Sequence, residues 1–316
     1  METLKSLFIE KKTKRKTQKK SLNCSPVVKN KRIHSESCFT PDVLMKIKDQ
    51  YNKRYPDNKI IEKDPTKVWY ILKERLSCDS EVCLLKQLDN QEQIKQFIFA
   101  PKHPPEWNSN PDEWLSNIDI EDVAKQYEVS NPEFKIIGPT TIDFDTRLPE
   151  SGGKCVLNDL CQFSLERFIQ AKKTKIGIVF NLDRHDQSGS HWVSLFIDID
   201  EKFLFFFDSA NNSIPSEIWQ KNPHGVTDPL VNRIIEQGKQ LKNPIHFKFY
   251  NNRGHSHQRS NTECGMYSLF FIITMLTGET PFHSKKLSMK ARRTLFLKKR
   301  IPDELMLKYR KLYFND

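Results

Sequence analysis

The sequence predicts an α+β fold in which helices flank a mixed central sheet, with a small helical module ahead of it. Three observations lead to this fold class. From about residue 98 onward, short apolar runs typical of strands alternate with segments of helical periodicity. Two of these runs, 191–199 and 202–208, are separated by a short polar stretch, which is typical of a β-hairpin. Residues 37–95, in contrast, show helical patterns alone.

The helical module over residues 37–95 is expected to contain three helices. Thr40 and Asp64 each stand before a proline and an amphipathic run, so each is predicted to cap a helix that begins at the proline. The third helix is short and is expected over residues 81–87. This module should fold ahead of a larger domain that spans residues 96–316.

The larger domain, residues 96–316, is expected to supply the sheet. Its helices are predicted at 114–127, 156–170, 228–242, 264–277 and 302–313. Its strands are predicted at 134–138, 140–144, 175–180, 191–199, 202–208 and 245–251. The helix at 264–277 is apolar on all sides, so it should be buried in the core.

Residues 1–36 hold most of the net charge of the chain. They contain 11 Lys and Arg against 3 Asp and Glu, so they account for +8 of the total of +11. A segment of this composition buries too little apolar surface to fold, and we expect a disordered leader. Its charge is compatible with attraction to nucleic acid or another anionic surface, with nuclear targeting, and with a purely solubilising role.

Composition also argues against several classes of protein. No apolar run approaches the roughly 20 residues of a membrane span, and the N-terminus lacks the apolar core of a secretory signal. Seven scattered cysteines argue against a disulfide framework and favour a reducing compartment. Cys78 and Cys83 are a weak zinc signal that packed thiols explain better. We therefore expect no metal and no cofactor.

Cys264 is the candidate nucleophile. It opens the apolar helix at 264–277, where the positive end of the helix dipole and the free backbone N–H groups favour a thiolate. The same N–H groups can stabilise an oxyanion, and Gly265 would let a scissile carbonyl approach the backbone. A cysteine in this place is also compatible with simple core packing.

His191 and Asp208 are the candidate general base and its carboxylate partner. They lie 17 residues apart at the ends of the predicted hairpin, so a tight turn at 198–202 would bring them side by side. The carboxylate could then hold one imidazole nitrogen while the other faces a thiol. His255 and His257 lie near Cys264 in the chain, and spacing alone does not exclude either of them as the base.

An ordered set of residues resembles the active-site signature of cysteine peptidases of the Ulp1 and adenovirus-protease kind. The set is His191-Trp192, then Asp208-Ser209, then Gln258 six residues before Cys264-Gly265. The segment from Trp114 to Ile120 is similar to the helix that precedes the catalytic histidine in that family. The resemblance covers roughly residues 100–280 and implies a Ulp1-like core with its nucleophile on a central helix.

The resemblance also implies a role for each matched residue. Cys264 would be the nucleophile, and His191 would be the general base and then the acid. Asp208 would orient the imidazole. The Gln258 amide would complete an oxyanion hole with the backbone N–H of Cys264.

The substrate-binding residues that the resemblance implies are Trp192, Gly265 and Trp114. Trp192 would pack over the histidine and wall a narrow channel for a Gly-Gly substrate end. The basic leader, the 37–95 module and a Lys-, Asn- and Ile-rich composition resemble virion proteases of large nucleocytoplasmic DNA viruses more than cellular SUMO proteases. In such enzymes a segment like 37–95 serves as an arm for substrates or partners.

These features predict an endopeptidase that processes viral structural precursors after Gly-Gly, in the virion and the host-cell cytoplasm. Two alternatives stay open. One is an isopeptidase that removes a ubiquitin-like modifier by the same chemistry. The other is a non-catalytic virion protein that binds nucleic acid through residues 1–36 and keeps only the fold.

Overall fold

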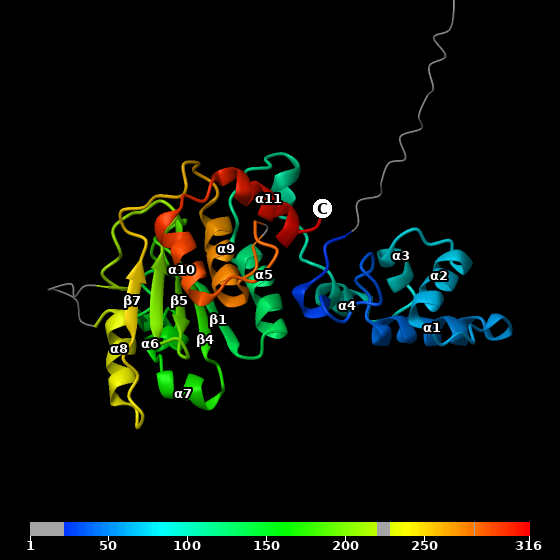
Figure 1. Ribbon diagram of the computed structural model, residues 1–316, viewed down its shortest axis with the longest axis horizontal. Coiled ribbons are helices and arrows are strands. Elements are labelled where there is room, and N and C mark those ends of the chain that lie inside the picture. The colour runs from blue at the N-terminus through cyan, green and yellow to red at the C-terminus, as the bar shows by residue number, and fades with distance from the viewer. Residues whose placement is uncertain (1–21, 220–227, 281) are drawn as a thin grey trace, which may run out of the picture.

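The computed structural model describes residues 22–219, 228–280 and 282–316, and these form two bodies (Figure 1). The smaller body is an arm of short helices. Its helices are α1 (Pro41–Arg54), α2 (Pro65–Arg75), α3 (Glu81–Leu85) and α4 (Gln91–Ile98). The first three match the predicted helices, and Thr40 and Asp64 cap α1 and α2 through their side chains. The prediction misses α4, whose N-cap, Asn90, makes no side-chain capping bond.

The arm has a hydrophobic core of its own, and part of the predicted leader belongs to it. Val28 is fully buried there, and the Ser25 N–H donates to the Ile98 carbonyl at 2.9 Å. Residues 22–36 are therefore ordered rather than disordered, because their few apolar side chains, among them Leu22, Val28 and Ile33, were hidden in the average composition of the leader. Residues 1–21 lie outside the described residues.

A five-stranded sheet forms the centre of the larger body. Its strands, in spatial order, are β1 (Phe134–Thr141), β4 (Lys175–Asn181), β5 (Trp192–Asp198), β6 (Phe203–Phe207) and β7 (Lys248–Asn251). The two outer pairs are parallel and the two inner pairs are antiparallel. A separate ribbon joins β2 (Arg147–Leu148) and β3 (Lys154–Cys155). The mixed sheet confirms the predicted fold class.

Helices cover both faces of this sheet (Figure 1). One face packs against α5 (Asn117–Ser130), α9 (Cys264–Thr277), α10 (Met289–Lys298) and α11 (Asp303–Tyr313). The other face packs against α6 (Asn158–Cys161), α7 (Leu165–Gln170) and α8 (Leu230–Gln240). The two-residue period of a strand explains this division, since Phe205 and Phe207 of β6 face α9 while Phe206 faces α8. Gly177 lets α9 come close, because a Cβ there would lie 2.9 Å from Ile272.

Two predicted helices differ from the structure, and one observed helix was not predicted. The helix expected at 114–127 begins at Asn117, because Ser116 and Asp119 form a capping box, and Trp114 therefore lies in an extended segment. The helix expected at 156–170 is divided into α6 and α7, and the Ser164 side chain caps the second of them. The strongly basic α10 was not predicted.

The cysteines also correct the sequence analysis. The structure contains the disulfides Cys24–Cys38, Cys78–Cys83 and Cys155–Cys161. Each closes a short loop, so these are local links and not the framework of a small disulfide-rich fold. The seventh cysteine, Cys264, keeps a free thiol.

No helix in the described ranges is long and apolar enough to cross a bilayer. Within the same ranges, no group of three or more His, Cys, Asp or Glu side chains is arranged to hold a metal ion.

Candidate active site

Cys264 is the first residue of α9, the central helix that packs against the sheet. The preceding residue, Glu263, is the N-cap, and its carbonyl accepts the first helical hydrogen bond from Tyr267 at 2.9 Å. The thiol therefore lies among the unpaired N–H groups of the helix start, as the sequence predicted. Cys264 is 1% exposed, and it lies on a rigid element rather than on a loop.

The β5–β6 hairpin brings His191 beside Asp208. Asp198 pairs with Phe203 at the closed end, so the residue before β5 and the residue after β6 meet at the open end. His191 Nε2 lies 2.6 Å from Asp208 Oδ1. This contact leaves the Nδ1 side of the ring for the thiol.

The Asp208 carboxylate and main chain are held by several groups. Its carboxylate also accepts from the N–H groups of Ala210 at 2.9 Å and Asn212 at 2.7 Å. The buried Asn252 amide bonds both the N–H and the carbonyl of Asp208, at 3.0 and 2.7 Å. The carboxylate is thereby fixed in direction before any substrate binds.

The electrostatics of this pair favour a protonated imidazole. Burial opposes a charge on His191, but hydrogen bonds to Asp208 and Cys264 and the charges of both groups raise its pKa to about 9. Burial acts to raise the pKa of Asp208, yet the bond to His191 and the two backbone N–H groups hold that pKa below its usual value. The site therefore favours an ionised carboxylate beside a charged ring.

His257 does not have the geometry of a base. It is fully buried, its Nε2 lies 3.0 Å from the Phe296 carbonyl, and its Nδ1 accepts from the Ile301 N–H at 3.1 Å. Burial and the charges of His255 and Arg300 lower the pKa of His257 to about 4, even though the Phe296 bond opposes this. Both ring nitrogens are therefore engaged with the main chain, and the ring is neutral.

Gln258 is fixed to the end of β6 by Ser209. The Ser209 hydroxyl donates to Gln258 Oε1 at 2.7 Å, and the Ser209 carbonyl accepts from the N–H groups of His257 and Gln258, both at 2.9 Å. Gln258 Nε2 donates to the Ser260 carbonyl at 2.7 Å. The direction of the amide is thus set by groups on both sides of it.

Trp114 and Trp192 line one groove of about 680 Å³, which also borders Leu115 and Gly189. Trp192 is held rigidly, since its indole N–H donates to the Leu115 carbonyl at 3.0 Å. A Cβ at Gly265 would lie 3.1 Å from Leu115 Cβ and 3.3 Å from Trp192 Cδ1. The glycine therefore allows close packing beneath Trp192, and its predicted role, an open approach for the substrate, stays a prediction.

The sequence analysis assigned no role to several residues around the site. Ser209 and Asn252 are buried polar residues that fix Gln258 and Asp208. Glu263 forms a buried ion pair with Arg310, 47 residues along the chain. Ser209 follows Asp208 and Glu263 precedes Cys264, so their positions offered a signal. The sequence offered none for Asn252 or Arg310, because their contacts depend on the tertiary fold.

A cysteine peptidase needs a thiol, a base beside it and a group that holds the base, and the hairpin and α9 bring such groups to one place. Comparison with known proteins agrees with this class, and the protein is a cysteine peptidase.

Residues 166–308 match the model of the Ulp1 protease family, C-terminal catalytic domain. The chain is 29% identical over 270 residues to a candidate thiol protease of Acanthamoeba polyphaga mimivirus, covering 78% of this chain and 82% of that protein. It is 28% identical over 263 residues to the SUMO-1 cysteine protease of African swine fever virus, covering 77% and 85%.

The crystal structure of the African swine fever virus protease has the same fold as this chain. The superposition gives a TM-score of 0.58 at 23% identity, and it covers 94% of this chain and 96% of that one. The coverage includes the arm as well as the sheet.

Proposed function

We propose that Cys264 is the nucleophile of this peptidase and that His191 is its general base and acid. The thiolate attacks the scissile carbonyl, and the protonated imidazole gives its proton to the leaving amine as the acyl-enzyme forms. His191 then takes a proton from the water that hydrolyses the thioester. The observation that carries this assignment is the 2.6 Å contact between His191 and Asp208, at the start of the helix that presents the chain's free thiol.

The proposed oxyanion hole consists of the Gln258 amide and the backbone N–H of Cys264. An amide nitrogen carries two hydrogens, and the bond to Ser260 uses one of them. We assign the second to the developing oxyanion. Preorganised donors of this kind contribute about 10²- to 10³-fold to the rate.

For the substrate, we propose cleavage after Gly-Gly in viral structural precursors during virion maturation. The similar proteins from mimivirus and African swine fever virus support a viral setting. The rigid Trp192, packed against Gly265, supports a channel that small residues fit best.

A second candidate is removal of a ubiquitin-like modifier, because the name of the African swine fever virus relative is a SUMO-1 cysteine protease. Both reactions would use the same thiol chemistry, so the active-site residues do not separate them. The substrate side of the site has to be tested directly.

The deciding experiment compares two substrates with the same enzyme. One is a fluorogenic Gly-Gly-X precursor peptide with an Ala-Ala-X control, and the other is a ubiquitin-like protein with a fluorogenic C-terminal conjugate. The maturation proposal expects cleavage of the Gly-Gly-X peptide, at least tenfold less of the control, and little of the conjugate. The reverse preference would favour the isopeptidase. Turnover by Cys264→Ser would contradict the nucleophile assignment.

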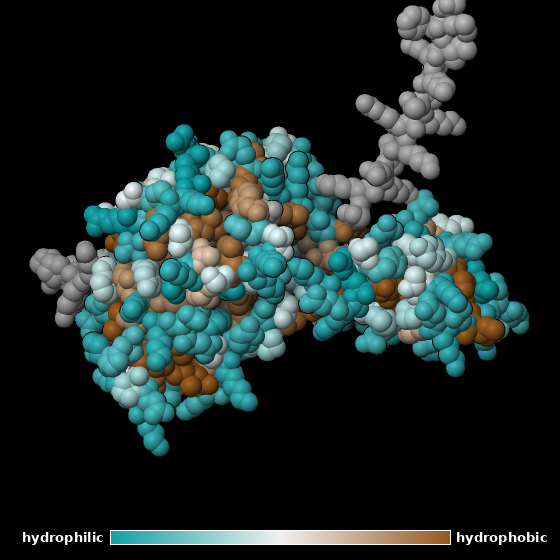
Figure 2. Space-filling model, viewed as in Figure 1, coloured by the Kyte–Doolittle hydropathy of each residue, from teal (hydrophilic) through white to brown (hydrophobic). Residues whose placement is uncertain are grey.

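We also propose that the 37–95 module serves as an arm that binds substrate proteins or partners. Apolar side chains reach its surface at the end away from the catalytic body (Figure 2). Ile61 is 88% exposed and Tyr70 is 58% exposed. Ile61→Asp should raise KM for a full-length precursor while leaving hydrolysis of a short peptide unchanged. An equal KM of the wild-type enzyme and Ile61→Asp for the full-length precursor would contradict the proposed role of the arm.

We propose that residues 1–21, which hold eight of the 11 basic residues of the 1–36 segment, attract nucleic acid. Their removal should flatten the salt dependence of binding to a DNA duplex and leave peptide hydrolysis unchanged. Unaltered salt dependence would contradict this proposal.

A further inference from the structure

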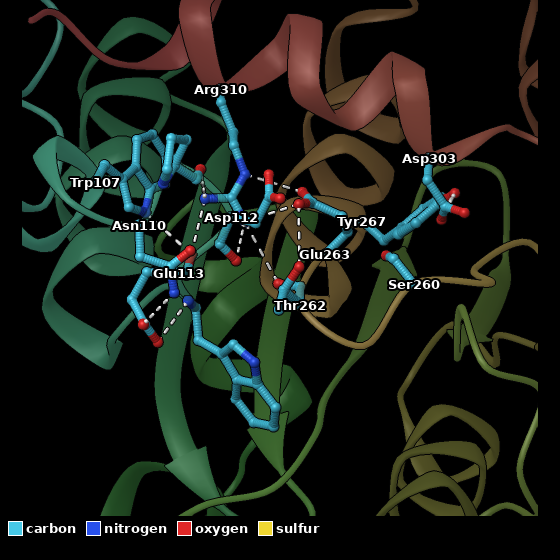
Figure 3. A network of polar contacts seen from close by, with 12 residues as sticks. Trp107, Asn110, Asp112, Glu113, Ser260, Thr262, Glu263, Tyr267, Asp303 and Arg310 are labelled. Carbon is cyan, nitrogen blue, oxygen red and sulfur yellow. Dashed lines mark hydrogen bonds and ion pairs between the residues drawn. The ribbon is translucent and has the colours of Figure 1, made fainter.

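The C-terminal helix α11 lies along the loop that leads into Cys264 at the start of α9 (Figure 3). At its first turn, Asp303 accepts from the Arg259 N–H at 3.1 and 3.2 Å and from the Tyr267 hydroxyl at 3.0 Å. Arg310 lies seven residues later, about two turns along, and so faces the same side. The helix therefore contacts the loop at two separate points.

The guanidinium of Arg310 binds the carboxylate of Glu263, the residue immediately before Cys264. Nε donates to Oε2 at 3.0 Å and Nη2 donates to Oε1 at 2.9 Å, which is bidentate pairing. Arg310 is 4% exposed and Glu263 is 1% exposed, so solvent screens this pair very little. Holding Glu263 fixes the N-cap of α9, and with it the position of the thiol.

The same guanidinium also holds a second segment. Nη1 donates to the carbonyls of Glu113 at 2.7 Å and Pro111 at 3.2 Å, and the cation lies over the Trp107 ring at 4.3 Å (Figure 3). The Trp107 indole N–H donates to the same Glu113 carbonyl at 3.0 Å. This segment leads directly into the groove wall, where the Leu115 carbonyl holds the Trp192 indole.

We propose that Arg310 is a positioning residue that sets the Cys264 thiol and the groove wall relative to each other. It does so through Glu263 on one side and the carbonyls of Pro111 and Glu113 on the other. This proposal rests on the proposed role of Cys264 as the nucleophile. It gives α11 a function in the reaction, although Arg310 lies outside the matched family domain, residues 166–308.

A purely stabilising role explains this arrangement less well. A buried ion pair is weak support for a fold, because apolar side chains of similar volume often replace it at no cost. The forked donors of arginine, in contrast, fit one carboxylate and two carbonyls in a fixed geometry that lysine cannot reproduce. A lysine at position 310 would keep the charge and lose that geometry.

The test is Arg310→Lys with Arg233→Lys as its matched control. Arg233 also binds a carboxylate, Asp145, at 2.9 Å, and a carbonyl, that of Cys161, at 3.1 Å, but on the other face of the sheet. Arg310→Lys should lower kcat about 100-fold on a Gly-Gly-X peptide with KM changed less than about threefold. Arg233→Lys should have a similar effect on Tm and leave kcat unchanged.

A second measurement uses the fact that Cys264 is the only cysteine outside a disulfide. Arg310→Met removes the donors that hold Glu263 and the carbonyls of Pro111 and Glu113, so alkylation of the Cys264 thiol by iodoacetamide at about pH 7 should slow at least about tenfold in the folded variant. Arg233→Met should leave the alkylation rate within about twofold of wild type, and an unchanged rate in folded Arg310→Met would overturn the positioning role.

The two proposals fail in different ways. If Cys264→Ser keeps turnover, the nucleophile assignment fails. If Cys264→Ser is inactive and folded Arg310→Lys keeps the wild-type kcat, only the positioning role fails. Should Arg310→Lys not fold, Glu263→Gln decides, because positioning expects a fall in kcat of about tenfold and an unchanged kcat overturns it.

Discussion

Two histidines, the half-buried His191 and the buried His257, have surroundings of opposite charge. His191, before β5, faces Asp208 and the thiol, and its pKa is raised to about 9. His257 bonds two main-chain groups near Arg300, and its pKa is lowered to about 4. Burial acts to lower the pKa of both rings, so burial alone does not define a catalytic base. A base is defined instead by a charged partner on one ring nitrogen and by a second ring nitrogen that no main-chain group occupies.

The largest expected effect separates the two histidines by activity. His191→Ala should lower kcat on a Gly-Gly-X peptide by about 10⁴-fold, because it removes the group that moves the proton in both steps. His257→Gln should lower kcat by less than about tenfold. It should instead lower the free energy of unfolding by about 1–3 kcal/mol, because buried main-chain groups lose their partner.

Steady-state kinetics and urea unfolding of the same two variants measure these effects. A loss of kcat in His257→Gln equal to that in His191→Ala, with stability unchanged, would reverse the assignment of the base.

The next effect concerns the partner of His191. Asp208→Asn should lower kcat by about 100-fold, less than His191→Ala, because an amide still contacts the ring but no longer favours its charge. The variant also loses one of the carboxylate bonds to the N–H groups of Ala210 and Asn212. Single-turnover kinetics of the acyl-enzyme step measures the loss. Equal losses in Asp208→Asn and His191→Ala would mean that Asp208 does more than orient the ring.

The sequence allowed part of this site to be predicted, and the reasons are physical. The helix bounds at Cys264–Thr277 are confirmed, because an apolar run ended by Gly278 in the left-handed region is a local signal. The hairpin that brings His191 to Asp208 is likewise local. The exclusion of His257 depends instead on Phe296 and Ile301, 39 and 44 residues away, and no spacing rule shows such contacts.

The pH dependence of stability should have opposite signs for the two histidines. The folded pKa of His191 is raised, so its contribution is complete below pH 6.5 and is lost as the pH rises through about 9. The folded pKa of His257 is lowered, so the fold loses stability as the pH falls from about 6.5 to about 4. Each pKa difference corresponds to a few kcal/mol, on the order of 3.

Urea unfolding between pH 4 and 9.5 tests this pair of signs. His191→Gln should remove the alkaline loss and keep the acid one, and His257→Gln should do the reverse. The kcat of the wild-type enzyme should also fall above about pH 9, since the leaving amine needs the proton of His191. If one of these variants removed both the alkaline and the acid loss of stability, the two histidines would not titrate independently.

The smallest effect concerns Ser209, which follows Asp208 in the chain and hydrogen-bonds to the segment of His257 and Gln258. Its carbonyl holds the His257 and Gln258 N–H groups, and its hydroxyl holds the Gln258 amide at 2.7 Å. Ser209→Ala removes only the hydroxyl, so kcat should fall about three- to tenfold while KM and Tm stay close to wild type. Gln258→Ala alone should cost about 100-fold. Because the hydroxyl acts through that amide, adding Ser209→Ala to Gln258→Ala should change kcat no further. Independent, additive losses would show that Ser209 supports the Asp208 side of the site instead.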